Sequence, residues 1–479
     1  MFSFFKRTFA LAVSFIMALC IIPLTEILAD ESGNISVNNA IIGEKYQLYK
    51  VFDLTYSGSL TAPTYKKQSS DPFFDALISA ESPFELTRIM STDEYVVTYK
   101  SGYSSTDSHI IDFLKSKESL LDGRAISSAN LDGNSCACGT TIQWNSVSFG
   151  YYWLSSSAGL YVMLDSTTPN ITITEKNSVP TFTAYQKSRI EDNFTDHQIS
   201  GTINDPVYYQ IQITPGKGNN KAMNIVSELT NLHSISGVNV TLTRSGETPQ
   251  AIDSTSYTQT ISDTANRKLA IRFSDTFVST LTDTDVLTIE YQAILSKNAK
   301  VIGEQIDANN NTITFQYSNQ TSNQTLLIET TKITITKADS QSKVLNGAIV
   351  RIYRESAGGT ALRFKNVNDN YLISDPSGTE DIKLSSSDIK GLATGKYYIE
   401  EVEAPKGYQK LTQRMEITVD GNNTGRIDGT TVTGGFIIVN KPGITLPASG
   451  SSSFLVLTIT GCITMAAGIF LVLHHRRHV

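Results

Sequence analysis

Short runs of alternating polar and apolar residues recur along most of the chain and predict β-strands. Clear examples lie at 36–38, 95–99, 207–211 and 312–315. Turn-forming residues separate such runs, which is typical of half-buried antiparallel strands in sandwiches. A helical repeat of apolar positions is weak by comparison, and residues 71–88 and 109–121 are the best short helix candidates. The pattern therefore predicts an all-β chain built from tandem immunoglobulin-like β-sandwich modules.

Two breaks in the strand pattern divide the chain into modules. One run of strands ends near Asn177, and Pro180 opens the next run. A strand-like segment restarts at Thr331, after the Asn/Gln/Ser-rich stretch 318–324. We therefore predict an N-terminal module at 30–178, a middle module at 179–330 and a C-terminal module at 331–443.

The two ends of the chain carry apolar segments of different kinds. Residues 454–473 are uncharged and would reach about 30 Å as a helix, enough to span a bilayer core. A basic tail with Arg476 and Arg477 follows, as expected of a cytoplasmic end. At the other end, Lys6 and Arg7 precede a mostly apolar run at 8–22, and Ala29 offers a small residue for cleavage, which predicts a signal peptide at 1–29. An exported protein with a C-terminal transmembrane helix follows from these features.

Three strands of the C-terminal module each aim one polar residue at an apolar face. Lys337 shares a face with Ile333 and Ile335, while Glu401 and Asn440 continue the apolar faces of their own strands. Burying these groups separately is costly. Placed together, a neutral lysine amine can attack the amide of Asn440 while Glu401 transfers protons, which leaves a Lys–Asn isopeptide bond. The alternative is an edge-exposed lysine, a surface glutamate and an asparagine at a strand end.

Composition excludes several other functions. The formal net charge is −7 and no basic patch stands out, so we expect no nucleic-acid partner. The region after the signal peptide and before the spanning segment keeps only Cys136 and Cys138, too few to staple the fold with disulfides. Its histidines are widely spaced and lack a nearby nucleophile motif, which argues against a hydrolase. We expect no metal site and no cofactor.

Specific motifs of the C-terminal module resemble the CnaB domains of Gram-positive surface proteins. The opening strand with Lys337-Ala338-Asp339, the E-box-like run 397–408 and the closing strand 435–441 carry this resemblance. It implies an autocatalytic isopeptide bond between Lys337 and Asn440, assisted by Glu401. The usual E-box has Thr where this chain has Val402. Glu400 and Glu403 fall outside the matching slot.

The middle module resembles the second, CnaA-like domain of backbone pilins, most clearly at 291–293 and 315–319. This resemblance implies a second isopeptide bond at Asn319, with Lys187 as the amine and Glu228 as the acid. The family usually places its lysine nearer Pro180, where this chain has Ala184. The alternative is that Lys187 is a solvated surface residue and Asn319 part of a turn.

The last predicted segment, 444–479, resembles a cell-wall sorting signal. Its motif is the pentapeptide Leu446-Pro447-Ala448-Ser449-Gly450, in which Ser449 replaces the usual Thr of Leu-Pro-x-Thr-Gly. A simple membrane anchor is the alternative. In polymerising pilins a lysine near the end of the first domain accepts the sortase-activated end of another subunit. The resemblance points to Lys176 for this role; Lys187 competes with it, and an ordinary exposed linker lysine is the alternative.

Together these resemblances imply a backbone pilin: a secreted, wall-anchored structural subunit of a surface pilus. It would be a sortase substrate with a single autocatalytic turnover, and not an enzyme in the usual sense. The implied partners are sortase, other pilin subunits and peptidoglycan, with host matrix proteins as a further class in adhesion. The alternative function is that of a wall-anchored adhesin or minor pilin that binds a host matrix protein.

Overall fold

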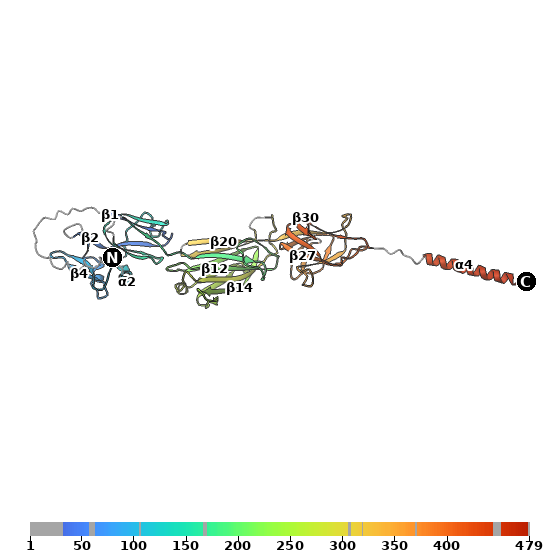
Figure 1. Ribbon diagram of the computed structural model, residues 1–479, viewed down its shortest axis with the longest axis horizontal. Coiled ribbons are helices and arrows are strands. Elements are labelled where there is room, and N and C mark those ends of the chain that lie inside the picture. Colours follow the sequence, from blue (N-terminus) through green and yellow to red (C-terminus); the bar gives the residue numbers. More distant parts are fainter. Residues whose placement is uncertain are drawn as a thin grey trace, which may run out of the picture. The chain divides into compact units, whose positions relative to one another are not determined.

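The computed structural model describes residues 32–56, 63–104, 107–165, 170–304, 308–318, 320–368, 371–443 and 452–477. Within these ranges the chain is dominated by β-strands arranged in several sheets, as Figure 1 shows. The all-β fold class is therefore confirmed. The predicted signal peptide, the pentapeptide 446–450 and Asn319 lie outside the described residues.

The described chain packs as two compact units. The first takes in the residues up to Ser178 together with the short segment Lys217–Asn219. The second contains Val179–Gly216 and the residues from Asn220 onward. Two separate hydrophobic cores lie in the second unit, one built from residues 184–328 and one from residues 333–438. The second unit thus holds a middle and a C-terminal module with a core each.

The first unit has a six-stranded sheet in the order β4-β5-β3-β2-β7-β8 and a three-stranded sheet in the order β6-β1-β9. Its strands are β1 (Ser32–Asn38), β2 (Tyr46–Tyr56), β3 (Pro63–Gln68), β4 (Phe84–Arg88), β5 (Glu94–Tyr99), β6 (Thr141–Ser148), β7 (Gly150–Ser156), β8 (Tyr161–Asp165) and β9 (Asn170–Thr174).

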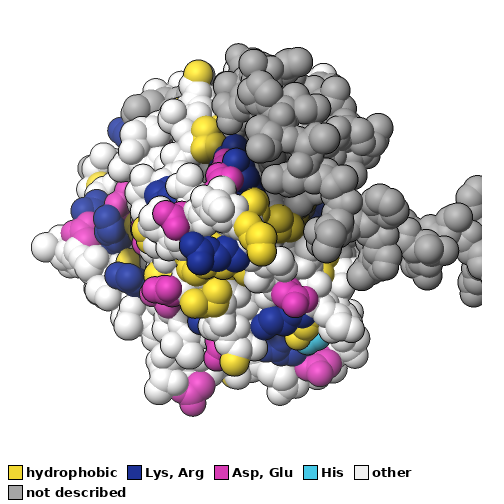
Figure 2. Space-filling model, turned by 90° about the vertical axis from the view of Figure 1, so that its left-hand side faces the viewer, with side chains coloured by type: hydrophobic (Ala, Val, Ile, Leu, Met, Phe, Trp, Pro, Cys, Tyr) yellow, Lys and Arg dark blue, Asp and Glu magenta, His cyan; other side chains and the backbone are white. Residues whose placement is uncertain are grey.

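The face of the molecule in Figure 2 carries Lys and Arg side chains interspersed with Asp and Glu side chains. On the described part of that face, charges of both signs are mixed.

One of the two predicted helices is only partly correct. The second candidate is confirmed by α2 (Ser108–Ser116) and the 3₁₀ helix η1 (Glu118–Leu121). Of the first candidate, 71–88, only α1 (Phe74–Leu77) is helical, and its last residues form β4 paired with β5. Pro83 explains this difference, because proline removes a backbone donor and pushes the preceding residue toward extended conformations.

The middle module is a sandwich of a five-stranded sheet, β10-β12-β18-β14-β15, and a six-stranded sheet, β11-β20-β19-β13-β17-β16. The strands are β10 (Thr181–Lys187), β11 (Ile199–Ser200), β12 (Pro206–Thr214), β13 (Met223–Thr230), β14 (Leu232–Thr243), β15 (Gln250–Ala251), β16 (Tyr257–Ser262), β17 (Lys268–Phe273), β18 (Val286–Leu295), β19 (Asn310–Tyr317) and β20 (Gln320–Glu329), and α3 is Asp275–Val278. Strict alternation along β12 and β18 turns every second side chain into the core.

The C-terminal module pairs a five-stranded sheet, β23-β24-β26-β21-β31, with a six-stranded sheet, β25-β22-β27-β28-β29-β30. The strands are β21 (Thr331–Asp339), β22 (Ala348–Tyr353), β23 (Phe364–Asn368), β24 (Tyr371–Ser374), β25 (Ile382–Leu384), β26 (Ser386–Leu392), β27 (Gly395–Glu403), β28 (Met415–Gly421), β29 (Thr424–Ile427), β30 (Thr430–Thr433) and β31 (Phe436–Asn440). The first strand, β21, lies parallel to the last strand, β31.

Beyond the sheets, the chain ends in the helix α4 (Ser452–His475). Residues Val456–His475 of this helix are long and apolar enough to cross a membrane. This finding fits the predicted transmembrane anchor.

Candidate functional site

The alternation of β21 brings a lysine into the core of the C-terminal module. Ile333, Ile335 and Lys337 take successive inward positions, and Lys337 has no exposed side-chain surface. The strand is held on both sides, by β26 in antiparallel and by β31 in parallel pairing. In the parallel register Lys337 lies opposite Ile438 of β31. The inward parity predicted for Lys337 is therefore present in the structure.

An acid and an amide reach the same point from two other strands. Glu401 is on β27 in the facing sheet, where Tyr397 and Ile399 are the other inward residues. Asn440 is the last residue of β31 and follows the buried Phe436 and Ile438. Glu401 and Asn440 are each only 1% exposed. The three polar residues are thus enclosed by the two sheets.

The three side chains meet at one carboxylate oxygen. Lys337 Nζ lies 2.9 Å from Glu401 Oε1 in an ion-pair contact. Asn440 Nδ2 donates hydrogen bonds to Oε1 at 2.9 Å and to Oε2 at 3.0 Å. The amine and the amide nitrogen therefore both contact Glu401 Oε1. The structure brings together the three residues that the sequence pattern proposed.

Backbone groups of the loop after β27 fix the orientation of the acid and the amide. Leu411 N–H donates to Glu401 Oε2 at 2.8 Å, and Asn440 Nδ2 donates to the carbonyl of Gln409 at 3.0 Å. A carbonyl can only accept, so Gln409 identifies which atom of the Asn440 amide is nitrogen. Oε2 accepts the Leu411 N–H, whereas Oε1 faces the Lys337 amine and the amide nitrogen of Asn440. Sequence reasoning missed both contacts because they come from the main chain.

Burial lowers the pKa of Lys337 from its ordinary value of 10.5, and the contact with Glu401 only partly opposes this effect. The apolar surroundings disfavour the charged ammonium, so the neutral and nucleophilic amine is more accessible than in water. Asn440 Oδ1 has no hydrogen-bond partner among the described residues. The arrangement offers a nucleophile, a proton carrier and an amide whose nitrogen faces that carrier.

The neighbouring acids of β27 point elsewhere. Glu400 accepts a hydrogen bond from Arg414 Nε at 3.0 Å on the outer face of the sheet. Glu403 is exposed. Of these three acids of β27, Glu401 alone reaches the buried amine.

The second proposed cross-link requires correction, because the structure does not bring Lys187 and Glu228 together. In β10 the buried positions are Ala184 and Gln186, so Lys187 lies on the opposite face. Its amine donates to the carbonyl of Ile190 at 2.7 Å. Glu228 belongs to the facing sheet, is 58% exposed, and pairs with Lys268 at 2.6 Å. Aromatic residues occur on both faces of β10, so the sequence pattern does not show which face is turned inward.

A hydrogen-bonded triangle occupies the core of the middle module instead. Ser227 Oγ donates to Asn311 Oδ1 at 2.7 Å, and Asn311 Nδ2 donates to Tyr291 Oη at 2.8 Å. Tyr291 Oη donates in turn to Ser227 Oγ at 2.9 Å, which closes the ring. Burial raises the pKa of Tyr291 to about 12, so its hydroxyl stays protonated at neutral pH. None of the three residues is an amine or an acid.

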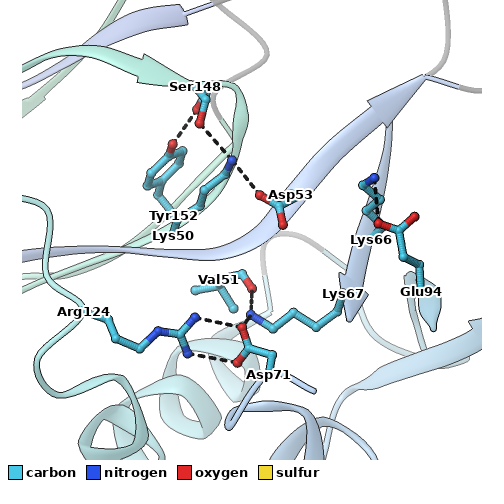
Figure 3. Close-up of polar contacts among 10 residues, drawn as sticks. All are labelled: Lys50, Val51, Asp53, Lys66, Lys67, Asp71, Glu94, Arg124, Ser148 and Tyr152. Atoms are coloured by element: carbon cyan, nitrogen blue, oxygen red, sulfur yellow. Dashed lines mark hydrogen bonds and ion pairs between the residues drawn. The ribbon is translucent and has the colours of Figure 1, made fainter. Parts of the chain in front are cut away.

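A second buried lysine lies in the first unit, where sequence reasoning did not look for one. Lys67 donates to the carbonyl of Val51 at 2.7 Å and contacts Asp71 Oδ2 at the same distance (Figure 3). Arg124 donates hydrogen bonds to both carboxylate oxygens of Asp71, at 2.9 and 2.8 Å. Burial would raise the pKa of Asp71, but the bonds from Arg124 and Lys67 outweigh it and hold that pKa well below its usual range. This cluster is an ion-pair network in which the carboxylate stays ionised.

The acceptor lysine proposed for polymerisation lies at the end of the first unit. Lys176 lies two residues after the end of β9 and is exposed. Its proposed partner Ser449 belongs to the pentapeptide outside the described residues. Among the described residues no group of three or more His, Cys, Asp and Glu side chains is placed to hold a metal ion.

Comparison with known protein families gives one match, in the C-terminal module. Residues 331–433 match the family model of SpaA, a prealbumin-like fold domain. The match lies within the C-terminal module and ends before β31, which carries Asn440. A comparison with curated proteins gives no significant match.

Similar solved structures include three major pilins. The full-length major pilin SpaD of Corynebacterium diphtheriae is 14% identical, with 86% of this chain and 98% of that chain covered and a TM-score of 0.47. The T6 backbone pilin of serotype M6 Streptococcus pyogenes is 16% identical, with coverages of 81% and 80% and a TM-score of 0.44. BcpA, the major pilin subunit of Bacillus cereus, is 12% identical, with coverages of 86% and 99% and a TM-score of 0.40.

Proposed function

We propose that this chain is a structural subunit of a covalently polymerised surface pilus, anchored in the cell wall of a Gram-positive bacterium. The observation that carries this proposal is the buried Lys337–Glu401–Asn440 cluster in a SpaA-type domain. Three further features support it: the tandem β-modules, the apolar helix α4 and the sorting-type pentapeptide before it.

The first reaction of the proposed function is internal. The neutral amine of Lys337 attacks Cγ of Asn440, so that an Nζ–Cγ bond forms and the Cγ–Nδ2 bond breaks. Glu401 transfers the proton from the attacking amine to the departing nitrogen, which leaves as ammonia. The product is an amide bond between the first and the last strand of the module. The step needs no cofactor or external reactant.

The second reaction joins subunits. The cysteine of a sortase attacks the carbonyl carbon of Ser449, and the peptide bond to Gly450 breaks. The amine of Lys176 on another subunit then attacks the thioester, forms an amide with Ser449 and releases the thiol. In the last transfer an amine of the peptidoglycan cross-bridge takes the place of Lys176. Each subunit therefore carries an electrophile, the carbonyl of Ser449, and a nucleophile, the amine of Lys176.

The internal bond is tested by intact mass. Formation of one isopeptide lowers the mass of the chain by about 17 Da, the mass of one ammonia molecule. We expect a single such loss, because the structure buries an amine beside an acid and an amide only in the C-terminal module among the described residues. An unreduced mass would refute the internal bond, and a double loss would require a second site.

The polymer is tested in wall extracts of bacteria that produce the full chain and its sortase. We expect a ladder of high-mass species that survives boiling in detergent and collapses in Lys176→Ala. The matched control is Lys66→Ala, which removes an amine of the same unit that is paired with Glu94. A persistent ladder in Lys176→Ala would assign the acceptor to another lysine. If wild type forms no ladder at all, a monomeric wall-anchored adhesin is favoured instead.

A further inference from the structure

A buried carboxylate lies directly beside the proposed acceptor lysine. Glu175 connects β9 to Lys176, and its side chain is 3% exposed although it lies next to the exposed lysine. Its own N–H donates to the carbonyl of Asn38 at 2.9 Å, which extends the pairing of β9 with β1 by one residue. An ionised carboxylate is costly to bury unless several donors satisfy it. The contacts of Glu175 therefore need an explanation.

Four donors converge on the two oxygens of Glu175, two on each. Oε1 accepts the backbone N–H groups of Lys176 at 3.0 Å and Asn177 at 3.1 Å. Oε2 accepts the hydroxyl of Tyr46 at 3.1 Å and that of Ser156 at 3.4 Å. Tyr46 is itself fixed, because its hydroxyl accepts the N–H of Ile41 at 2.9 Å. The carboxylate thus links the peptide groups at the acceptor position to strands β2 and β7 of the folded core.

The other side of the acceptor segment is also held. Ser178 N–H donates to the carbonyl of Lys217 at 3.0 Å, and Asn219 N–H donates to the carbonyl of Ala158 at 2.9 Å. Gly218 has φ +106°, and a Cβ there would lie 2.3 Å from the carbonyl oxygen of Ala158. Only glycine permits this approach. The backbone around residue 176 is therefore fixed on both sides while the lysine side chain extends outward.

We propose that Glu175 is a positioning residue that presents the Lys176 amine to the sortase acyl-intermediate by locking the backbone from which it extends. This inference rests on the proposed function of Lys176 as acceptor. Accepting a bulky enzyme-bound thioester requires the amine to approach from a defined direction, and a displacement of about 1 Å can lower a rate about 100-fold. Glu175 sets this direction by fixing the backbone, and it does not contact the reacting atoms.

The test compares polymer-to-monomer ratios in wall extracts of cells that produce full-length variants. Glu175→Gln keeps a carbonyl oxygen that can accept both backbone N–H groups, and the two hydroxyls can turn to accept from its amide. Glu175→Met keeps the volume but removes every acceptor. We expect the Gln variant to polymerise nearly as well as wild type and the Met variant to lose at least about tenfold. The control Glu85→Met changes an exposed glutamate of the same unit.

The total amount of the protein at the cell surface distinguishes a loss of positioning from a folding defect in the variant. In Glu175→Met, a lower polymer-to-monomer ratio with an unchanged amount of surface protein supports the proposal. An unchanged ratio in this variant overturns it. If Glu175→Met does not reach the surface, Tyr46→Phe decides, because it leaves Glu175 in place and removes a donor to Oε2, together with the acceptor of the Ile41 N–H. We expect a reduced polymer-to-monomer ratio, and a wild-type ratio overturns the proposal. If Glu175→Gln lowers the polymer-to-monomer ratio as much as Glu175→Met does, the proposal is also overturned. The charge of Glu175 would then matter more than the hydrogen bonds that its side chain accepts. Lys176→Ala, run in parallel, reports separately on the acceptor itself.

Discussion

Two buried lysines of this chain show that partners decide what a buried amine does. Lys67 contacts a carboxylate that Arg124 holds ionised, so its amine has a permanent counter-charge and no leaving group beside it. Lys337 shares its acid with an amide, and Leu411 N–H and the Gln409 carbonyl leave Glu401 Oε1 facing the reactants. The first arrangement stabilises a fold through charge. Under the proposed function, the second would react and lose its charge.

Replacing Glu401 by Gln should stop bond formation, because a carboxamide cannot carry a proton between Lys337 and Asn440. The matched control is Glu400→Gln on the outer face of the same strand, where Glu400 pairs with Arg414. The two variants have the same composition, so their calculated masses are identical. We expect intact mass to show Glu401→Gln heavier by about 17 Da, the ammonia that is retained.

Glu401→Gln and Glu400→Gln should also differ in the free energy of unfolding. The bond between Lys337 and Asn440 closes a loop of about 100 residues, which stabilises the folded state by about 4–5 kcal/mol in the chain-entropy treatment used for disulfides. Glu401→Gln should lose an amount of this order in chemical denaturation, while Glu400→Gln should stay within about 1 kcal/mol of wild type. Equal masses for the two variants would show that Glu401 is dispensable.

The lowered pKa of Lys337 gives a pH dependence when the bond cannot form. In Asn440→Ala the amine remains buried beside Glu401, and burial keeps its pKa in the folded state below 10.5. Between that lowered pKa and 10.5 the unfolded chain binds more protons, so the free energy of unfolding should rise with pH, by at most about 1.4 kcal/mol per unit. Wild type, whose Lys337 would be an amide, serves as the reference. A flat difference between the two curves in chemical denaturation would contradict this assignment.

At the scale of elements, period-two alternation explains both what the sequence could predict and where it failed. In β21, β27 and β31 the two inward residues before the polar one are aliphatic or aromatic, so Lys337, Glu401 and Asn440 could be identified. In β10, aromatic side chains occur on both faces, and the parity of Lys187 could not be read. Main-chain contacts from Gln409 and Leu411 leave no side-chain signal at all.

The triangle in the middle module joins three strands, β13, β18 and β19, that belong to both of its sheets. Tyr291→Phe removes the hydroxyl that accepts from Asn311 and donates to Ser227, and leaves both partners buried with an unsatisfied group. We expect a loss of about 1–3 kcal/mol in chemical denaturation. The control is Tyr257→Phe, since the described residues supply no hydrogen bond to that hydroxyl. Equal losses would show that the triangle adds nothing specific.

At the scale of the whole molecule, the second unit has a tight junction between its two modules. Ile203 of the middle module is fully buried, and its N–H donates to the carbonyl of Gly391 at 2.9 Å. Arg354 of the C-terminal module contacts Asp205 at 2.8 Å. Gly391 has φ +100°, and a Cβ there would lie 2.8 Å from the Cβ of Ile203. The two cores are therefore joined by close contact as well as by the chain.

Gly391→Ala should weaken this junction by strain and by the collision with Ile203, at a cost of about 1–3 kcal/mol. We expect calorimetry to show the unfolding of the two modules separating into distinct transitions. Gly395→Ala is the matched control, because Gly395 also has a positive φ, of +138°, but has open space around its missing Cβ. Strain alone would make the variants equal, and that result would exclude a coupling role for the contact at Gly391.

The parallel pairing of β21 with β31 has a further consequence for a subunit under tension. With the proposed bond in place, a pull that enters the C-terminal module through β21 leaves it through Asn440, because these neighbouring strands would be joined covalently. Residues 338–439 then lie outside the stretched path. At about 3.4 Å per extended residue, roughly 350 Å of contour length would stay hidden however hard the fibre is pulled. A single amide would thus set how far the C-terminal module can lengthen.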